Sequence, residues 1–264
     1  MIHIEPTAFA IEQSAVLYRN VLAEGALGWS SQTADGFAAN ALGPQTYDAW
    51  VPSAMPANLN VTLAAPVECD CAAIIAHTLG SSGATAYVEA RNGTSGTWAL
   101  LASVTPADDS DLVLLFSDVS GTAYDQWRIR VTGSTIPAIG VAMIGPRLLI
   151  PGGTLSGYVP VNLALSVDLL PNITRGGQFL GNRVQKVGAG TSIQLSPQER
   201  WWVESEAAAF IAHFNEGKPF IWMSCPEVLP EDGSYCWRAG ATLSATFDAG
   251  AVWGDMSIEV AAHV

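Results

Sequence analysis

The sequence predicts a mostly β protein, with an antiparallel β-sandwich followed by a second β-sandwich that carries one packed α-helix. Two observations carry this fold class. Short apolar stretches recur along the chain with Gly, Pro, Asn or Asp at nearly every junction, as in sandwiches and barrels. A single segment near residue 200 combines helical periodicity with recognisable start and stop signals.

The first half of the chain contains most of the expected strands. Residues 59–63 (LNVTL) alternate between apolar and polar side chains, and residues 71–77 (CAAIIAH) form an apolar run typical of a buried strand. Further strands are expected at 85–91, 97–102, 112–116 and 127–132. Residues 1–22 form an entry segment that fits either one or two helical turns or an irregular strand.

The stretch AYVEARNGTSGTWALL (residues 86–101) predicts a β-hairpin. Asn92-Gly93 readily adopts the positive φ angles that tight hairpin turns require. Trp98 follows this turn and has two interpretations. It either plugs the core of the sandwich or forms an exposed platform on which a sugar ring stacks.

A Pro/Gly-rich segment at residues 144–157 interrupts the strand pattern and predicts a domain boundary. We therefore divide the chain into domains at residues 1–145 and 146–264, and expect the two halves to fold separately. In the second half, Ser196, Pro197 and Glu199 have the spacing of a capping box with proline at the first helical position. With Gly217 as a stop signal, this predicts a helix over about 196–215. Strands are expected at 158–170, 178–187, 219–224, 235–247 and 254–263.

Composition and charge argue against several function classes. The net charge is −13 and no basic run occurs, which argues against binding to nucleic acid. No apolar stretch approaches the ~20 residues that span a bilayer, so we expect no membrane insertion. Glu5 and Glu12 stand where a signal peptide has Lys or Arg, so we expect synthesis in the cytoplasm without processing. Charged residues make up only 13% of the chain, which favours a protein that buries surface against neighbours over a monomer with an uncharged surface.

No residue pattern indicates catalysis, a metal or a cofactor, so we expect a protein that is not an enzyme and has no cofactor. The sequence lacks H-E-x-x-H, G-x-S-x-G, Walker A and G-x-G-x-x-G elements. Cys69/Cys71 and Cys225/Cys236 form two pairs whose C-x-C spacing matches a zinc site poorly; buried free thiols and metal ligation both stay open. The acidic turn at 108–111 lacks the calcium-binding pattern of an EF-hand.

Five pieces of the first half, taken in order, carry a resemblance to a known family. They are TYDAW (46–50), MPANLNVTL (55–63), CDCAAIIAH (69–77), the 86–101 hairpin and FSDVSGTAYDQWRIRVTG (116–133). Together they resemble the discoidin-type, galactose-binding-like β-sandwich of carbohydrate-binding modules. The chain departs from that family in two places. Asn92 stands where the family usually has an aspartate before the glycine, and Asn60 and Thr62 replace the acidic position and its neighbour in the earlier strand. The resemblance implies ligand contacts on loops at one end, and the candidate glycan contacts are Trp29, Asp35, Asp48, His77, Arg91 and Asn92.

The second half carries a different resemblance, on LLPNITRGGQFLGNRVQKVG (169–188) and, after the helix, HFNEGKPFIWMSCPEVLPEDGSYCW (213–237). These segments resemble proteins from the tail tips of long-tailed bacteriophages, which lie near the distal tail protein and the hub. The resemblance implies a tail-tube-like β-sandwich with one packed helix, a fold used for ring assembly.

The two resemblances together predict a structural subunit of a phage tail tip or baseplate, made in the host cytoplasm and located in the virion. Expected partners are other tail proteins (distal tail, hub and tube) and further copies of the chain in a ring, with host surface polysaccharide as an additional candidate. The alternative is a free-standing, lectin-like carbohydrate-binding protein without an assembly role.

Aromatic crowding in residues 201–222 suggests where such an assembly contact lies. One helix and one edge strand do not readily bury so many rings, and an edge strand offers unpaired backbone groups to a neighbour. The candidate assembly contacts are Trp201, Trp202, Phe220 and Trp222. The alternative is that these rings fill a large core within the chain.

Overall fold

The structure is a computed structural model that describes residues 1–116 and 122–263, without the side chains of residues 166 and 185–187. The chain forms two compact units. Unit 1 comprises Met1–Ile150 and Phe220–Gly233, and unit 2 comprises Pro151–Pro219 and Ser234–Val264. The chain thus returns to unit 1 for residues 220–233. A single division of the chain after residue 145 does not predict this return. Separate folding of the two halves stays a prediction.

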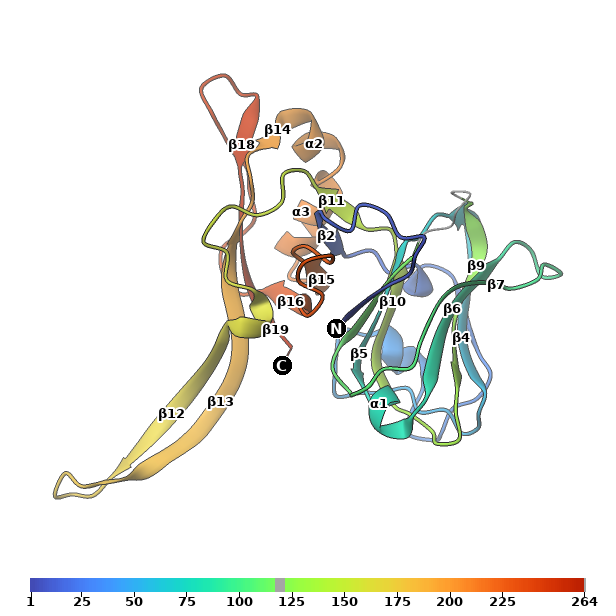
Figure 1. The fold of residues 1–264 in the computed structure, drawn as a ribbon, viewed down its shortest axis with the longest axis horizontal. Coiled ribbons are helices and arrows are strands. Elements are labelled where there is room, and N and C mark those ends of the chain that lie inside the picture. The colour runs from blue at the N-terminus through green and yellow to red at the C-terminus, as the bar shows by residue number, and fades with distance from the viewer. Residues whose placement is uncertain (117–121, 264) are drawn as a thin grey trace. The chain divides into compact units, whose positions relative to one another are not determined.

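Unit 1 is built mainly from strands, drawn in blue to yellow-green in Figure 1 except for the strand at residues 220–223, which is orange. Its elements are β1 (Ile2–Ile4), β2 (Ser14–Leu17), β3 (Ala26–Trp29), β4 (Ala57–Val67), β5 (Cys71–His77), α1 (Leu79–Ser82), β6 (Thr85–Arg91), β7 (Ala99–Val104), β8 (Leu112–Leu115), β9 (Tyr124–Thr132), β10 (Ile139–Gly145), β11 (Leu148–Ile150) and β15 (Phe220–Met223), with short 3-10 helices at Val21–Ala23 and Ala38–Leu42. A five-stranded sheet has the order β3-β4-β9-β6-β7, and a four-stranded sheet has the order β1-β8-β5-β10. Strand β2 pairs antiparallel with β11 and with β15.

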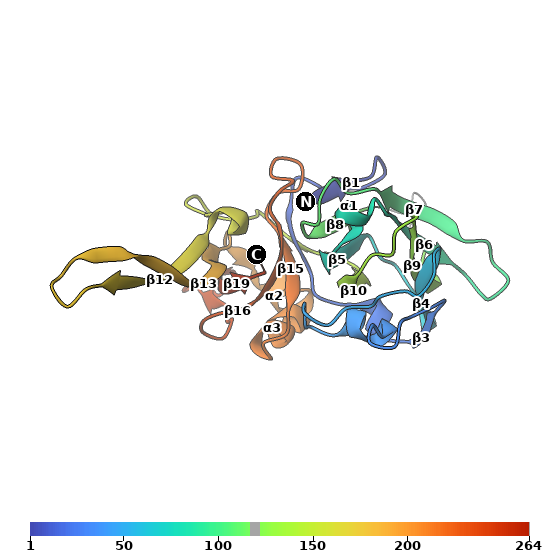
Figure 2. The same cartoon turned by 90° about the horizontal axis from the view of Figure 1, so that it is seen from below.

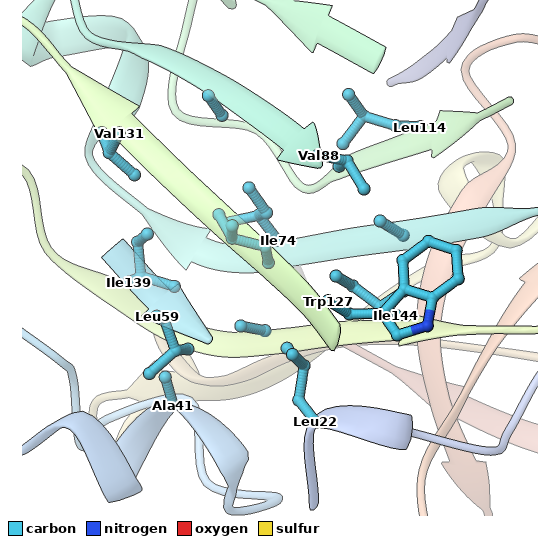
Figure 3. Packing of buried hydrophobic residues seen from close by; sticks show 14 of the residues in the cluster. Leu22, Ala41, Leu59, Ile74, Val88, Leu114, Trp127, Val131, Ile139 and Ile144 are labelled. Atoms are coloured by element: carbon cyan, nitrogen blue, oxygen red, sulfur yellow. The ribbon is translucent and has the colours of Figure 1, made fainter. Parts of the chain in front are cut away.

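The core of unit 1 lies between the five-stranded and the four-stranded sheets. Alternate residues of β9, including Trp127 and Val131, are fully buried and face residues of the opposite sheet such as Ile74 and Ile144 (Figure 3). All strand pairs in these two sheets are antiparallel except β1 with β8. The predicted antiparallel β-sandwich and the mostly β fold class are confirmed.

The 86–101 hairpin is present as β6 and β7, which pair antiparallel. Gly93 supplies the positive φ angle, at 67°. Asn92 has a different role, because its amide anchors the loop to the start of β9: Nδ2 donates to the carbonyl oxygen of Ala123 (3.2 Å), and Oδ1 accepts from the amide of Asp125 (3.1 Å).

Unit 2 contains a four-stranded antiparallel sheet in the order β16-β19-β13-β12 and a three-stranded sheet in the order β14-β18-β17. Its elements are β12 (Leu165–Ile173), β13 (Phe179–Gln194), β14 (Gln198–Glu199), α2 (Arg200–Ser205), α3 (Ala208–Asn215), β16 (Gly233–Arg238), β17 (Thr246–Phe247), β18 (Trp253–Asp255) and β19 (Ser257–Ala262), with a 3-10 helix at Val161–Leu163. Both views show β12 and the first part of β13 extending away from the rest of unit 2 (Figures 1 and 2).

The single helix predicted over 196–215 is wrong in its start and its continuity. Two short helices, α2 and α3, occupy this segment, and the chain turns between them. Ser196 does not cap a helix, because its hydroxyl donates to the carbonyl oxygen of Gly152 (2.7 Å) and β14 follows it. The stop signal is confirmed: Gly217 has φ of 75° and its amide donates to the carbonyl oxygen of Phe214 (2.9 Å). Within the described ranges, no helix is long and apolar enough to cross a bilayer.

Candidate functional site

The six predicted glycan contacts do not form one site. His77 ends β5 and is only 3% exposed, and its Nδ1 accepts from the amide of Leu79 (3.2 Å), so the prediction that it contacts a glycan is wrong. Arg91 and Asn92 lie at the far end of β6, which starts at Thr85 just after α1. A seven-residue strand is about 20 Å long, so Arg91 and Asn92 lie about 20 Å from the end of β6 that begins at Thr85.

Three other predicted glycan contacts, Trp29, Asp35 and Asp48, are exposed. Trp29 ends β3 at the edge of the five-stranded sheet and is 48% exposed. Asp35 and Asp48 lie on two loops of unit 1. These loops belong to one irregular region, since the amide of Thr33 donates to the carbonyl oxygen of Val51 (2.8 Å). The role of these three residues stays a prediction.

A polar and aromatic surface covers the outer face of the five-stranded sheet. Because β9 alternates, Arg128 and Arg130 point away from the core that Trp127 and Ile129 enter. The register places Glu89 of β6 opposite Arg128. We call this surface the arginine–tryptophan face, and its residues are Tyr87, Glu89, Arg91, Trp98, Gln126, Arg128 and Arg130.

Glu89 is the centre of the hydrogen bonds on this face. Its Oε2 accepts from Nε of Arg128 (2.6 Å) and from Nε of Arg130 (3.0 Å), and its Oε1 accepts from Nη2 of Arg130 (2.9 Å). Burial of this carboxyl raises its pKa, but the hydrogen bonds from Arg130 and Arg128 outweigh burial, and the pKa of Glu89 is lowered. The carboxylate is therefore ionised at neutral pH and orients both guanidinium groups.

Trp98 contacts two guanidinium groups. The guanidinium carbon of Arg128 is 4.0 Å from the centre of the indole ring, and that of Arg91 is 4.4 Å from it. Arg91 is held in turn by Gln126, whose Oε1 accepts from its Nε (2.8 Å). The interpretation of Trp98 as a core plug is wrong, and the fully buried Trp127 fills the core instead.

The arginine–tryptophan face has a positive charge although the chain is acidic overall. Its three arginines are balanced by one carboxylate, whereas the chain carries a net charge of −13. The other two basic residues of the first 150 each have a carboxylate partner: Arg19 pairs with Glu24 and Arg147 with Asp70. The face therefore offers guanidinium donors and an aromatic ring to ligands rich in oxygen.

The carboxylates of the acidic turn accept hydrogen bonds from within the turn and from α1. Oδ1 of Asp108 accepts from the hydroxyl (2.5 Å) and from the amide (3.0 Å) of Ser110, and Oδ1 of Asp109 accepts from the amide of Ser81 (2.9 Å). These hydrogen bonds lower the pKa of both carboxyls. Among the residues that the structure describes, no group of three or more His, Cys, Asp or Glu side chains is arranged to hold a metal ion. The cysteines form no disulfide.

Three of the four predicted assembly contacts are buried. Trp202 is 5% exposed, and Phe220 and Trp222 are fully buried, so these three offer no surface to a partner. The prediction that they form an interface is therefore wrong for this structure. Trp201 is 60% exposed, because it lies next to Trp202 on a short helix and cannot face the same core.

Unit 2 has an exposed apolar surface on the two-stranded part of β12 and β13, here called the ribbon (residues 165–189). Alternate residues of a strand share one face, and along β12 these are Leu165, Val167, Leu169 and Ile173. Leu169 is opposite Val184, and Ile173 is opposite Phe179. This apolar face is solvent-exposed: Leu165 57%, Val167 48%, Leu169 50%, Ile173 56%, Phe179 64% and Val184 54%. The alternation in LSVDLLPNI was the sequence signal for it.

Unit 2 also contains an apolar pocket of about 420 Å³, here called the tryptophan pocket. Two of its tryptophans are exposed, Trp201 (60%) and Trp253 (46%). Nε1 of Trp201 donates to Oε2 of Glu199 at the edge of the pocket. The pocket is lined by Pro151, Gly152, Pro197, Gln198, Glu199, Trp201, Trp202 and Trp253.

No protein-family model matches the chain, and no curated protein matches it. The solved structures to which it is similar include carbohydrate-binding modules. A family 32 module of C. perfringens NanJ, in complex with galactose, is 18% identical (TM-score 0.38; 50% of this chain, 98% of that one). Chitosan-binding module 1 from a chitosanase/glucanase of Paenibacillus sp. IK-5 is 13% identical (TM-score 0.40; 48% and 98%).

A GH29 fucosidase of Ruminococcus gnavus, in complex with fucose, is 18% identical with a TM-score of 0.41. That likeness covers 48% of this chain and only 26% of the fucosidase.

Proposed function

We propose that the protein is a structural subunit of a bacteriophage tail tip or baseplate, located in the virion, that assembles with copies of itself into a ring. The observation that carries self-assembly is the exposed apolar face of the ribbon. The resemblance of residues 169–188 and 213–237 to tail-tip proteins supports the phage assignment. Other tail proteins (distal tail, hub and tube) are the further partners of this proposal.

The ribbon needs a partner for physical reasons. A sheet face patterned with apolar residues is stabilised by packing against another layer, and an isolated two-stranded ribbon is marginally stable in water. Six side chains, each about half exposed, offer on the order of 500 Å² of apolar surface, the size of patch that marks an interaction site. Packing by another subunit removes this surface from water.

Native mass spectrometry of the purified full chain tests this proposal. We expect the wild type to form an oligomer with a defined number of copies, and Leu169→Asp to give monomers because it places a charge in the apolar contact. Val228→Asp is the matched control, since Val228 is 71% exposed on unit 1 and lies outside the ribbon. A wild type that stays monomeric at high concentration, or a Leu169→Asp variant that assembles like the control, contradicts the proposal.

Carbohydrate binding by unit 1 is the second candidate function, and the arginine–tryptophan face favours it. Guanidinium groups bind carboxylate and sulfate groups with charge-assisted hydrogen bonds, and an indole ring packs against sugar rings. The ligand that fits this face best is an acidic polysaccharide, which on a host cell surface would give the subunit a role in attachment. The same property without assembly would make the protein a free-standing lectin.

Calorimetric titration with an acidic polysaccharide and with a neutral one tests this second function. We expect binding of the acidic polysaccharide only, weakened at least tenfold in Trp98→Ala and unchanged in Trp29→Ala. Loss of binding in Trp29→Ala alone places the ligand at the loop end that the family resemblance implies. Absence of any heat of binding and of any rise in melting temperature contradicts carbohydrate binding by this face.

A further inference from the structure

The ribbon tip and the tryptophan pocket lie at opposite ends of one strand. Phe179 at the tip is the first residue of β13, and Gln194 is its last. After Gln194 the chain enters the pocket region, where the amide of Ser196 donates to the carbonyl oxygen of Gly153 (2.9 Å). Sixteen strand residues span roughly 50 Å. The tip therefore cannot reach the pocket of its own chain.

The two features are chemically alike. The tip presents Ile173, Phe179 and Leu180, which are 56%, 64% and 62% exposed. The pocket presents the rings of Trp201 and Trp253, which are 60% and 46% exposed. Its volume of about 420 Å³ is large enough for a phenyl ring with a neighbouring leucine or isoleucine side chain. Apolar contact between them removes both surfaces from water.

The charges beside the two features are opposite. Between residues 173 and 183, the tip carries Arg175 and Arg183, both exposed, and no acidic residue. Beside the pocket, residues 199–206 carry three exposed glutamates and one exposed arginine. One of these glutamates, Glu204, accepts a hydrogen bond from Arg200 (2.6 Å), which leaves the segment with a net negative charge. This complementarity favours the pocket as the partner of the tip.

We infer that the ribbon tip of one copy docks in the tryptophan pocket of the next copy, with Phe179 between Trp201 and Trp253. This inference rests on the self-assembly proposed above. The contact is heterologous, because each copy uses two different surfaces, and repetition of such a contact gives a closed ring or an open filament. Packing of two ribbons face to face would instead be isologous, would give dimers, and would leave the pockets open.

A mixing experiment with two variants distinguishes these arrangements. The tip variant is Phe179→Asp, which keeps an intact pocket. The pocket variant combines Trp201→Ser and Trp253→Ser, which keeps an intact tip. Both tryptophans are substantially exposed, so we expect the pocket variant to fold, and circular dichroism checks this. Tyr47→Ser, at a side chain 82% exposed on unit 1, is the matched control.

Heterologous docking predicts that each variant alone is a monomer and that the mixture forms a one-to-one heterodimer, read by native mass spectrometry. Each heterodimer has one intact contact, between the tip of the pocket variant and the pocket of the tip variant. The other tip and the other pocket are both mutated and form no second contact. The inference is overturned if the mixture of folded variants stays monomeric, or if the pocket variant assembles like wild type. In either case the ring proposal stands if wild type and the Tyr47→Ser control assemble in the same experiment. If wild type itself is monomeric, the proposed function fails and this inference fails with it.

Discussion

Replacing Glu89 by glutamine tests how the arginine–tryptophan face is organised. Glu89→Gln keeps the shape of the side chain and removes its charge, so Arg128 and Arg130 lose their shared anion. Three charge-assisted hydrogen bonds are affected. Glutamine keeps a neutral acceptor, and the two arginine side chains are 18% and 26% exposed, so water screens part of the loss. We expect a loss of about 2 kcal/mol in the stability of this sheet.

Hydrogen exchange followed by mass spectrometry measures this loss directly in peptides from β6 and β9. A loss of about 2 kcal/mol speeds exchange through opening of the sheet roughly 30-fold. Glu24→Gln is the matched control, because Glu24 also pairs with an arginine, Arg19, but both side chains are well exposed (38% and 42%). The control is expected to change stability by less than about 0.5 kcal/mol. Equal exchange in the two variants refutes the reasoning.

The same substitution has a defined pH dependence. The pKa of Glu89 in the folded protein is lowered, so it lies below the value in the unfolded chain. The stabilisation is therefore complete above the unfolded pKa of about 4.3 and is lost as the pH falls through the folded pKa. The difference between wild type and Glu89→Gln is expected to shrink in acid. A difference that stays constant on acidification contradicts the assigned role of this carboxylate.

Two further predictions concern buried titratable groups. Burial lowers the pKa of His77 and outweighs the opposing charges of Asp111 and Asp109, so the stability due to neutral His77 is present above the unfolded pKa of about 6.5 and is lost as the pH falls. The melting temperature of His77→Gln should therefore drop less than that of wild type on acidification from about pH 7.5 to 5, and an equal drop would count against this. Burial raises the pKa of Cys69 and Cys71, whereas Cys225 is partly exposed. Mass spectrometry should therefore find iodoacetamide on Cys225 first, and equally fast labelling of Cys71 would contradict its burial.

The strands of unit 1 could be predicted because local patterns encode them. The predicted segments 71–77 and 85–91 coincide with β5 and β6, since runs of apolar residues between turn residues identify buried strands. The side of the sheet on which Trp98 lies could not be predicted. A register shift between Val88 and Glu89 in the pairing of β6 with β7 changes which residues face each other, and alternation within one strand does not reveal it.

Features that depend on distant segments were missed. Ser196 has the local pattern of a helix cap, but a hydrogen bond to Gly152, far away in sequence, holds it instead. Trp222 looked like an exposed contact in the sequence, yet its strand joins β2 near the start of the chain and is buried. The arginine–tryptophan face exists because β6 pairs with β9, which brings Arg91 and Arg128 together around one ring.

The central claim is that copies of this chain associate through the ribbon. Sedimentation velocity of the full-length protein over about a hundredfold range of concentration tests it most directly, because association follows mass action. The account predicts that wild type sediments as a closed oligomer and that Phe179→Asp sediments as a monomer throughout. Wild type that sediments as a single chain over the whole range, with the same coefficient as Phe179→Asp, contradicts it.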